Sequence, residues 1–205
     1  MKDWFFTWFN TPYYHLLYKD RDHLEAEIFL SNLLQKLNPD STAKFLDVAC
    51  GKGRHSIYIN QQGFTVCGID LSRKSISYAQ QFQNEKLKFV VHDMRCDFQN
   101  NYYNYVLNLF TSFGYFESKE DNQKAINSMV NNLKSKGKII IDFMNAKKVF
   151  SQLVKIEKKK VENINFYIQK KIEKGHIIKD IYFQDQGKKF HFQEKVQLLF
   201  LNDFR

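Results

Sequence analysis

Three acidic side chains stand where an α/β chain most readily places chemistry, at the ends of consecutive apolar runs. Asp47 lies near the end of AKFLDVA, Asp70 ends FTVCGID, and Asp93 ends LKFVVHD. Gly51 and Gly53 follow the first acid, and an amphipathic pattern then begins. Because ligands of open parallel sheets bind beyond the carboxyl ends of the strands, the pattern predicts a nucleotide-type site.

The acid before the glycines narrows the choice of ligand. A carboxylate at Asp47 would repel a pyrophosphate resting on the helix N-terminus that follows. It favours a cofactor that carries positive charge and no phosphate, and S-adenosylmethionine has both an ammonium and a sulfonium. Asp70 stands where an acid accepts the two ribose hydroxyls, and Asp93 could accept from the exocyclic amine of adenine. The glycine turn alone, with Ser56 in place of a third glycine, leaves an NAD-dependent oxidoreductase as an alternative.

Alternating strand and helix patterns position these acids. Apolar runs at residues 43–49, 64–70, 87–93, 102–110 and 138–145 are separated by segments of helical periodicity. This alternation predicts an α/β fold with a doubly wound, mostly parallel sheet and helices on both faces. We expect a helix over residues 20–39 before the first strand. A long polar-faced helix is expected over residues 117–137, ending near Gly137.

We interpret the 205 residues as a single domain with three parts. Residues 1–38 form an aromatic N-terminal helical cover, and residues 39–145 form the cofactor-binding core. Residues 146–205 form a helix followed by an antiparallel β meander. After residue 160 apolar and polar residues alternate, with turn signals at EKG and DQGKK, which predicts three strands.

Composition excludes several classes of protein. No apolar run approaches the roughly 20 residues that span a bilayer, and the N-terminus lacks a secretion signal, so we expect a cytoplasmic protein without membrane contact. The three cysteines are scattered without metal-ligand spacing, so no metal site is expected.

The net charge of +9 is unevenly placed. Residues 1–145 carry 17 basic and 15 acidic side chains, whereas residues 146–205 carry 14 and 7. Such a basic segment can form a binding surface for nucleic acid. It can also be a lysine-rich surface that faces only solvent, and this is the interpretation we prefer.

The motifs around the acids resemble those of class I S-adenosylmethionine-dependent methyltransferases, towards the bacterial small-molecule branch. LDVACGKGRHS matches the family's first motif, GIDLS the next, VHDMR the adenine-side motif and LNLFTSFGYF the fourth-strand segment. The resemblance covers residues 40–145 and implies a Rossmann-like fold. It implies that Asp47, Gly51 and Gly53 contact the methionine part of the cofactor and that Asp70 and Leu71 hold the ribose. It further implies that Asp93 and Met94 flank the adenine and that Leu109, Phe110 and Thr111 line the sulfonium side. Ala49, in the first motif, is also expected to contact the cofactor.

The implied activity is methyl transfer to a small-molecule acceptor by in-line displacement, which requires alignment more than a dedicated acid or base. Catalytic residues are therefore unknown, with weak candidates in Tyr14, His15, His55 and Tyr115. There are two alternatives to this activity: a methyltransferase that acts on RNA or protein, and a degenerate domain that binds the cofactor without transferring a methyl group. The sequence is compatible with a monomer and with a homodimer. The family continues beyond its fifth strand to a helix and closing strands, whereas this sequence stops at LNDFR. We expect either a chain truncated before those strands or a meander that replaces them.

Overall fold

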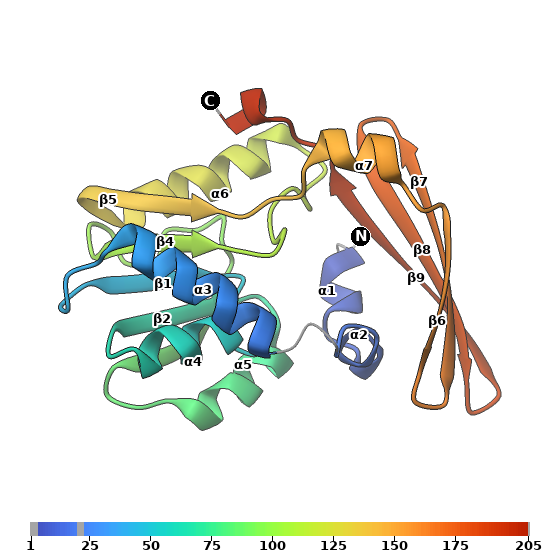
Figure 1. The fold of residues 1–205 in the computed structure, drawn as a ribbon, viewed down its shortest axis with the longest axis horizontal. Helices are drawn as coiled ribbons and strands as arrows, with labels where there is room; N and C mark the ends of the chain where they lie inside the picture. The colour runs from blue at the N-terminus through green and yellow to red at the C-terminus, as the bar shows by residue number, and fades with distance from the viewer. Residues whose placement is uncertain (1–3, 20–22, 205) are drawn as a thin grey trace. The chain divides into compact units, whose positions relative to one another are not determined.

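The computed structural model describes residues 4–19 and 23–204, which divide into two units, each with its own sheet (Figure 1). The parallel-sheet unit comprises Asp20–Ser112 and Ser118–Asp142. The antiparallel-sheet unit comprises Met1–Lys19, Phe113–Glu117 and Phe143–Arg205. All the residues expected to hold the cofactor belong to the parallel-sheet unit.

The parallel-sheet unit has five strands in the order β3-β2-β1-β4-β5, with every neighbouring pair parallel. From the central β1 the chain moves outward through β2 and β3, and then returns to the other side for β4 and β5. The doubly wound parallel sheet predicted from the sequence is therefore confirmed, and the order reverses between β1 and β4. The strands are β1 Lys44–Val48, β2 Thr65–Asp70, β3 Leu87–Val91, β4 Tyr103–Asn108 and β5 Leu133–Ile141.

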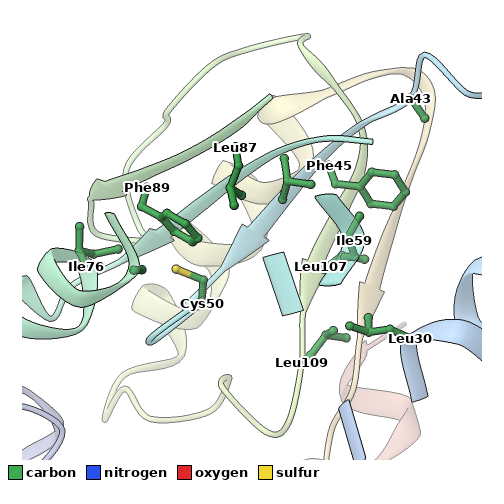
Figure 2. Close-up of a cluster of buried hydrophobic side chains, with 12 residues drawn as sticks. Leu30, Ala43, Phe45, Cys50, Ile59, Ile76, Leu87, Phe89, Leu107 and Leu109 are labelled. Carbon is green, nitrogen blue, oxygen red and sulfur yellow. The ribbon is translucent and has the colours of Figure 1, made fainter. Parts of the chain in front are cut away.

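Four α-helices cover this sheet. Leu30 of α3, Ile59 of α4 and Ile76 of α5 are fully or almost fully buried, in one cluster with Phe45 and Leu107 from the strands (Figure 2). On the usual scale, burying each of these large side chains contributes about 1.5–3 kcal/mol. The helices are α3 His23–Leu37, α4 Arg54–Gln61, α5 Arg73–Ala79 and α6 Lys119–Asn132, with a 3₁₀ turn η1 at Gln80–Phe82.

Helix α6 ends five residues before the predicted position near Gly137. Leu133 already pairs with Tyr103 in the sheet, and Asn132 turns its side chain to backbone amides of a neighbouring loop. Strand pairing therefore overrides the helical propensity of the residues after Asn132.

The antiparallel-sheet unit carries four strands, β6 Ile156–Val161, β7 Ile164–Glu173, β8 His176–Asp185 and β9 Lys188–Gln197, in sequential order. The antiparallel meander predicted after residue 160 is confirmed in β7, β8 and β9. The sheet has one further strand that was not predicted, β6, whose sequence IEKKKV hides its alternation behind lysines. The other elements of this unit are α1 Trp4–Trp8, α2 Pro12–Leu17, α7 Ala146–Gln152 and a 3₁₀ turn η2 at Leu201–Phe204.

The aromatic N-terminal segment packs on this second sheet. Trp8 and Leu17 are buried with Phe166 and Ile181, and the Trp8 ring stacks on Phe192 with 4.5 Å between centroids. Across residues 4–19 and 23–204, no helix has the length and apolar character needed to cross a membrane.

Candidate functional site

Asp70 ties together the two turns that follow β1 and β2. Its Oδ2 accepts a hydrogen bond from the backbone amide of Gly51 at 2.9 Å, and its Oδ1 accepts one from the amide of Ser72 at 2.7 Å. Burial raises the pKa of Asp70, and these two amide hydrogen bonds partly oppose the rise. Each carboxylate oxygen has two lone pairs, so both can still accept from a ligand hydroxyl.

Asp47 is a deeply buried carboxyl group in β1, with an exposed fraction of 1%. Burial raises its pKa to about 7, the hydrogen bond donated by Ser56 Oγ at 2.6 Å opposes this, and the charge of Asp70 adds to it. Such a carboxyl group is half-ionised near neutral pH and gains from a nearby positive charge.

The two glycines of the turn serve different purposes. Gly51 adopts φ +57° and has no atom within 4 Å of the point where a Cβ would lie. Gly53 adopts φ +81°, and a Cβ there would lie 2.5 Å from the Phe89 ring. Gly51 therefore leaves open space above the turn, whereas Gly53 lets the start of α4 pack against β3. Ala49 in the same turn is left-handed too, with φ 60°.

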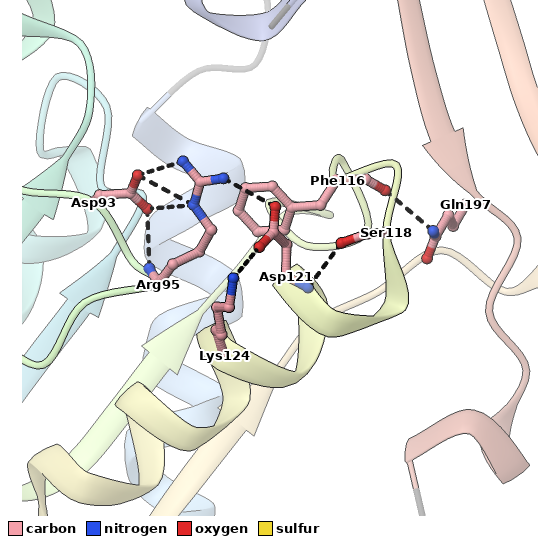
Figure 3. Close-up of polar contacts among 7 residues, drawn as sticks. All are labelled: Asp93, Arg95, Phe116, Ser118, Asp121, Lys124 and Gln197. Carbon is pink, nitrogen blue, oxygen red and sulfur yellow. Dashed lines mark hydrogen bonds and ion pairs between the residues drawn. The ribbon is translucent and has the colours of Figure 1, made fainter.

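Asp93 lies two residues beyond β3. Arg95 donates to it from its backbone amide at 2.9 Å and from its guanidinium, with the shortest distance 2.6 Å (Figure 3). Burial would raise the pKa of Asp93, but the hydrogen bonds from Arg95 outweigh it, and the pKa is lowered. Leu71 and Met94, which follow the two strand-end acids, are half-buried.

The turn after β4 is conformationally strained. Phe110 and Thr111 are both left-handed, at φ 54° and 57°, although neither is glycine. Asp142 holds this pair, because its Oδ2 accepts from the Phe110 amide at 2.9 Å and its backbone oxygen from the Thr111 amide at 3.0 Å. Leu109 is only 2% exposed and packs in the core, so backbone atoms rather than its side chain are available to a ligand. Strain of this kind concentrates at functional sites.

Nε2 of His55 and Oδ1 of Asn108 are buried without a hydrogen-bond partner among the described residues. The His55 ring stacks on Phe110 with 4.9 Å between centroids. Burial, with help from the charge of Arg54, lowers the pKa of His55 to about 3. His55 is therefore neutral at physiological pH and a weak general base.

The other three catalytic candidates belong to the antiparallel-sheet unit. Tyr14 and Tyr115 lie far apart in sequence, yet both contact the Phe9 ring, at 4.7 and 5.6 Å between centroids. The His15 ring lies 5.3 Å from that of Tyr14. The structure thus gathers three of the candidates in one aromatic cluster.

Sequence reasoning missed two residues that shape the site, Arg95 and Asp142. Asp142 is a strand-end acid in KIIIDFMN, so the rule that found Asp47, Asp70 and Asp93 also applies to it. Arg95 follows Asp93 by two residues, the spacing at which an aspartate side chain commonly accepts from the backbone.

These donors and acceptors fit S-adenosylmethionine better than a phosphate-bearing cofactor. The turn presents carboxylates at two adjacent strand ends and open space above Gly51. Its two basic side chains lie over aromatic rings, Lys52 at 4.9 Å from the Tyr78 centroid and Arg54 at 4.4 Å from that of Phe110. In the described part of the chain, no three His, Cys, Asp or Glu residues gather in a way that could hold a metal ion.

Comparison with known proteins agrees with this geometry. The family described as "Methyltransferase domain" matches residues 39–195. YqeM of Bacillus subtilis is 33% identical over 110 residues, covering 52% of this chain and 44% of YqeM. The dTDP-3-amino-3,4,6-trideoxy-alpha-D-glucopyranose N,N-dimethyltransferase of Streptomyces venezuelae is 25% identical, covering 63% and 54%. The matched stretch thus spans about half the length of these curated relatives.

The fold has solved counterparts as well. The crystal structure of an S-adenosylmethionine-dependent methyltransferase from Clostridium acetobutylicum superposes with a TM-score of 0.75 at 21% identity, covering 94% of this chain and 81% of that one. The strand order, the acids at the strand ends and the family match over residues 39–195 lead to one assignment. The chain belongs to the methyltransferase-domain family.

Proposed function

We propose that this protein transfers a methyl group from S-adenosylmethionine to the amine of a small-molecule acceptor. The observation that carries the proposal is the buried carboxyl group of Asp47 beside the open space above Gly51, where a cationic and phosphate-free cofactor gains most. The relative from Streptomyces venezuelae is named for the dimethylation of an amino sugar, which supports an amine as the acceptor.

In this proposal each strand end contacts a different part of the cofactor. Asp70 accepts from the ribose hydroxyls beside Leu71, and Asp93 accepts from the adenine amine beside Met94. The ammonium lies towards Asp47. The sulfonium side is lined by the turn that Asp142 holds. The remaining contacts come from backbone atoms of Ala49, Gly51, Gly53, Leu109, Phe110 and Thr111.

The chemistry asks little of acid or base groups in the protein. When bound, S-adenosylmethionine supplies a methyl group on a positively charged sulfur, which is an excellent leaving group. The residues of this chain bind the donor, fix its orientation and exclude water, and such alignment can account for most of the acceleration of an in-line displacement.

Changing Asp70 to alanine tests the cofactor assignment. Wild-type protein should bind S-adenosylhomocysteine in the micromolar range and should not bind NADH, as measured by calorimetry. The variant should bind S-adenosylhomocysteine about 10–150-fold more weakly, because a hydrogen bond to a charged acceptor contributes about 1.5–3 kcal/mol. Changing the exposed Asp97 to alanine is the matched control and should leave the affinity unchanged. Binding of NADH in place of S-adenosylhomocysteine would refute the proposal.

One observation favours RNA as a second candidate acceptor. Lys158, Tyr167, Tyr182 and His191 occupy one row across the four antiparallel strands, and Tyr182 is an exposed ring. A basic and aromatic row on a sheet can bind single-stranded RNA. This candidate predicts that a short single-stranded RNA binds at 50 mM salt and that its affinity falls steeply towards 200 mM. Absence of binding at the lower salt in a filter-binding assay would remove it.

A further inference from the structure

The loop after β3 holds Asp93 in a fixed orientation. The backbone amide of Arg95 donates to Asp93 Oδ1 at 2.9 Å, which closes a tight turn on the side chain itself. Arg95 Nε lies 3.0 Å from Oδ1 and 3.2 Å from Oδ2, and its Nη2 donates to Oδ2 at 2.6 Å (Figure 3). The guanidinium therefore grips both oxygens, and such a fork sets the plane of a carboxylate.

Arg95 is itself held from the other side. Its Nη1 donates to Oδ2 of Asp121 at 3.1 Å, in the first turn of α6. The Asp121 amide donates to the N-cap Ser118, and Lys124 donates to the other oxygen of Asp121 at 2.9 Å (Figure 3). Asp93, Arg95 and Asp121 are each about one-quarter exposed, so water screens these contacts only in part.

One face of helix α6 also holds the remainder of the loop that follows β3. Ser128 Oγ donates to the Cys96 carbonyl at 2.7 Å, and Asn132 Oδ1 accepts from the Gln99 amide at 2.6 Å. Positions 121, 128 and 132 are 7 and 11 residues apart, which is two and three helical turns, so they share one face. The loop that carries Asp93 is thus supported along most of the helix.

The contacts leave Asp93 with a small remaining capacity to accept. A carboxylate offers about four acceptor positions. Three N–H groups of Arg95, from its backbone, Nε and Nη2, occupy positions on Asp93, and about one is left. That number matches a single donor from a ligand.

We propose that Arg95, held by Asp121, is a positioning residue that keeps Asp93 as a fixed carboxylate with one acceptor position for the 6-amino group of the cofactor's purine. The inference rests on the proposed function and deepens it, because it assigns the selectivity for a 6-amino purine to the Arg95–Asp121 pair. A fixed carboxylate accepts from a 6-amino group and repels the oxygen of a 6-oxo group, so the pair sets the preference for adenine over hypoxanthine.

Two ligands that differ at one position test this. Calorimetry on the whole chain compares S-adenosylhomocysteine with S-inosylhomocysteine, in which a 6-oxo group replaces the amine. Wild type should prefer the adenine form by about 10–150-fold, the range for one hydrogen bond to a charged group. Arg95→Met, which keeps the stem and loses the fork, should reduce the preference about tenfold with little change for the 6-oxo ligand. A general loosening of the loop would weaken both ligands together.

Matched variants separate the outcomes. Asp121→Asn should reduce the preference less than Arg95→Met, Arg95→Lys should restore part of it, and Lys124→Met should leave it at the wild-type value. A wild-type preference that survives in Arg95→Met and in Asp121→Asn would overturn the inference. If the wild type binds neither ligand, the proposed function itself is refuted. A failure of the proposed function can therefore be distinguished from a failure of this inference. If Arg95→Met does not fold, as judged by circular dichroism, the Asp121→Asn comparison decides.

Discussion

Asp47→Asn is expected to stabilise the ligand-free protein, and by more at pH 8 than at pH 5. The asparagine oxygen can still accept from Ser56 Oγ, while the buried charge is removed. We expect the stability difference between the variant and wild type to grow by about 2–3 kcal/mol between the two pH values, since one pKa unit corresponds to about 1.4 kcal/mol. For a chain of this length that corresponds to a relative rise in Tm of about 5–10 °C, measured by thermal unfolding.

The sign follows from the direction of the shift. Burial raises the pKa of Asp47 from 3.8 to about 7, so between these values the folded state holds a proton that the unfolded state has lost. Stability associated with this group is complete below pH 3.8 and is lost as the pH rises to about 7. Asparagine cannot ionise and does not show this loss. Asp40→Asn, which removes one exposed acid, is the control for the loss of a negative charge at the surface.

The same substitution should weaken cofactor binding. In wild type, a cation near Asp47 favours the ionised carboxylate, so the affinity for S-adenosylmethionine should fall about tenfold per pH unit below pH 7. The affinity of Asp47→Asn should be lower at pH 8 and nearly independent of pH. Calorimetry in buffers of different ionisation enthalpy should detect proton release by the wild type alone. A variant that loses stability at pH 8, or keeps full affinity, would contradict this account of Asp47.

The parallel sheet was predictable because its signals are local. Each strand of the parallel-sheet unit contains a short apolar run, although β5 begins with the mostly polar residues that precede it. Ser72 caps α5 by accepting from the Ser75 amide, as its position before the helix predicts. Strand β6 was missed because its three consecutive lysines carry no apolar period, and only its pairing with β7 makes it a strand. Tertiary pairing likewise ends α6 at Asn132, although the sequence beyond it is compatible with a helix.

The acidic residues of the site could be predicted from the sequence, but the residues that hold the site in place could not. Asp47 and Asp70 follow from a rule about strand ends, which needs only the sequence. The partners that orient such acids come from elsewhere in the chain: Asp121 reaches Arg95 across 26 positions, and Asp142 reaches the Phe110 amide across 32. Because such contacts depend on how helices and strands pack, spacing along the chain does not reveal them.

Gly53→Ala is expected to cost about 3–5 kcal/mol of stability, the largest loss we expect from a single methyl group in this chain. A Cβ at Gly53 would lie 2.5 Å from two atoms of the Phe89 ring, and the residue is at φ +81°. The clash accounts for about 1–3 kcal/mol and the left-handed backbone for a similar amount. Chemical denaturation of the ligand-free protein measures the loss, and Gly63→Ala, at φ +95° with nothing within 4 Å, isolates the backbone contribution.

Gly51→Ala, in contrast to Gly53→Ala, should lower the stability only slightly and weaken cofactor binding strongly. At φ +57° with nothing within 4 Å, the added methyl group costs only the backbone strain of about 1–2 kcal/mol. It would enter the space that the proposed cofactor requires, so the affinity for S-adenosylhomocysteine should fall at least about tenfold among molecules that remain folded. A double-mutant cycle with Phe89→Leu should recover about 1–2 kcal/mol for Gly53→Ala and nothing for Gly51→Ala. Equal stability losses at the two glycines, or unchanged affinity in Gly51→Ala, would show that the open space above the turn is not where the cofactor lies.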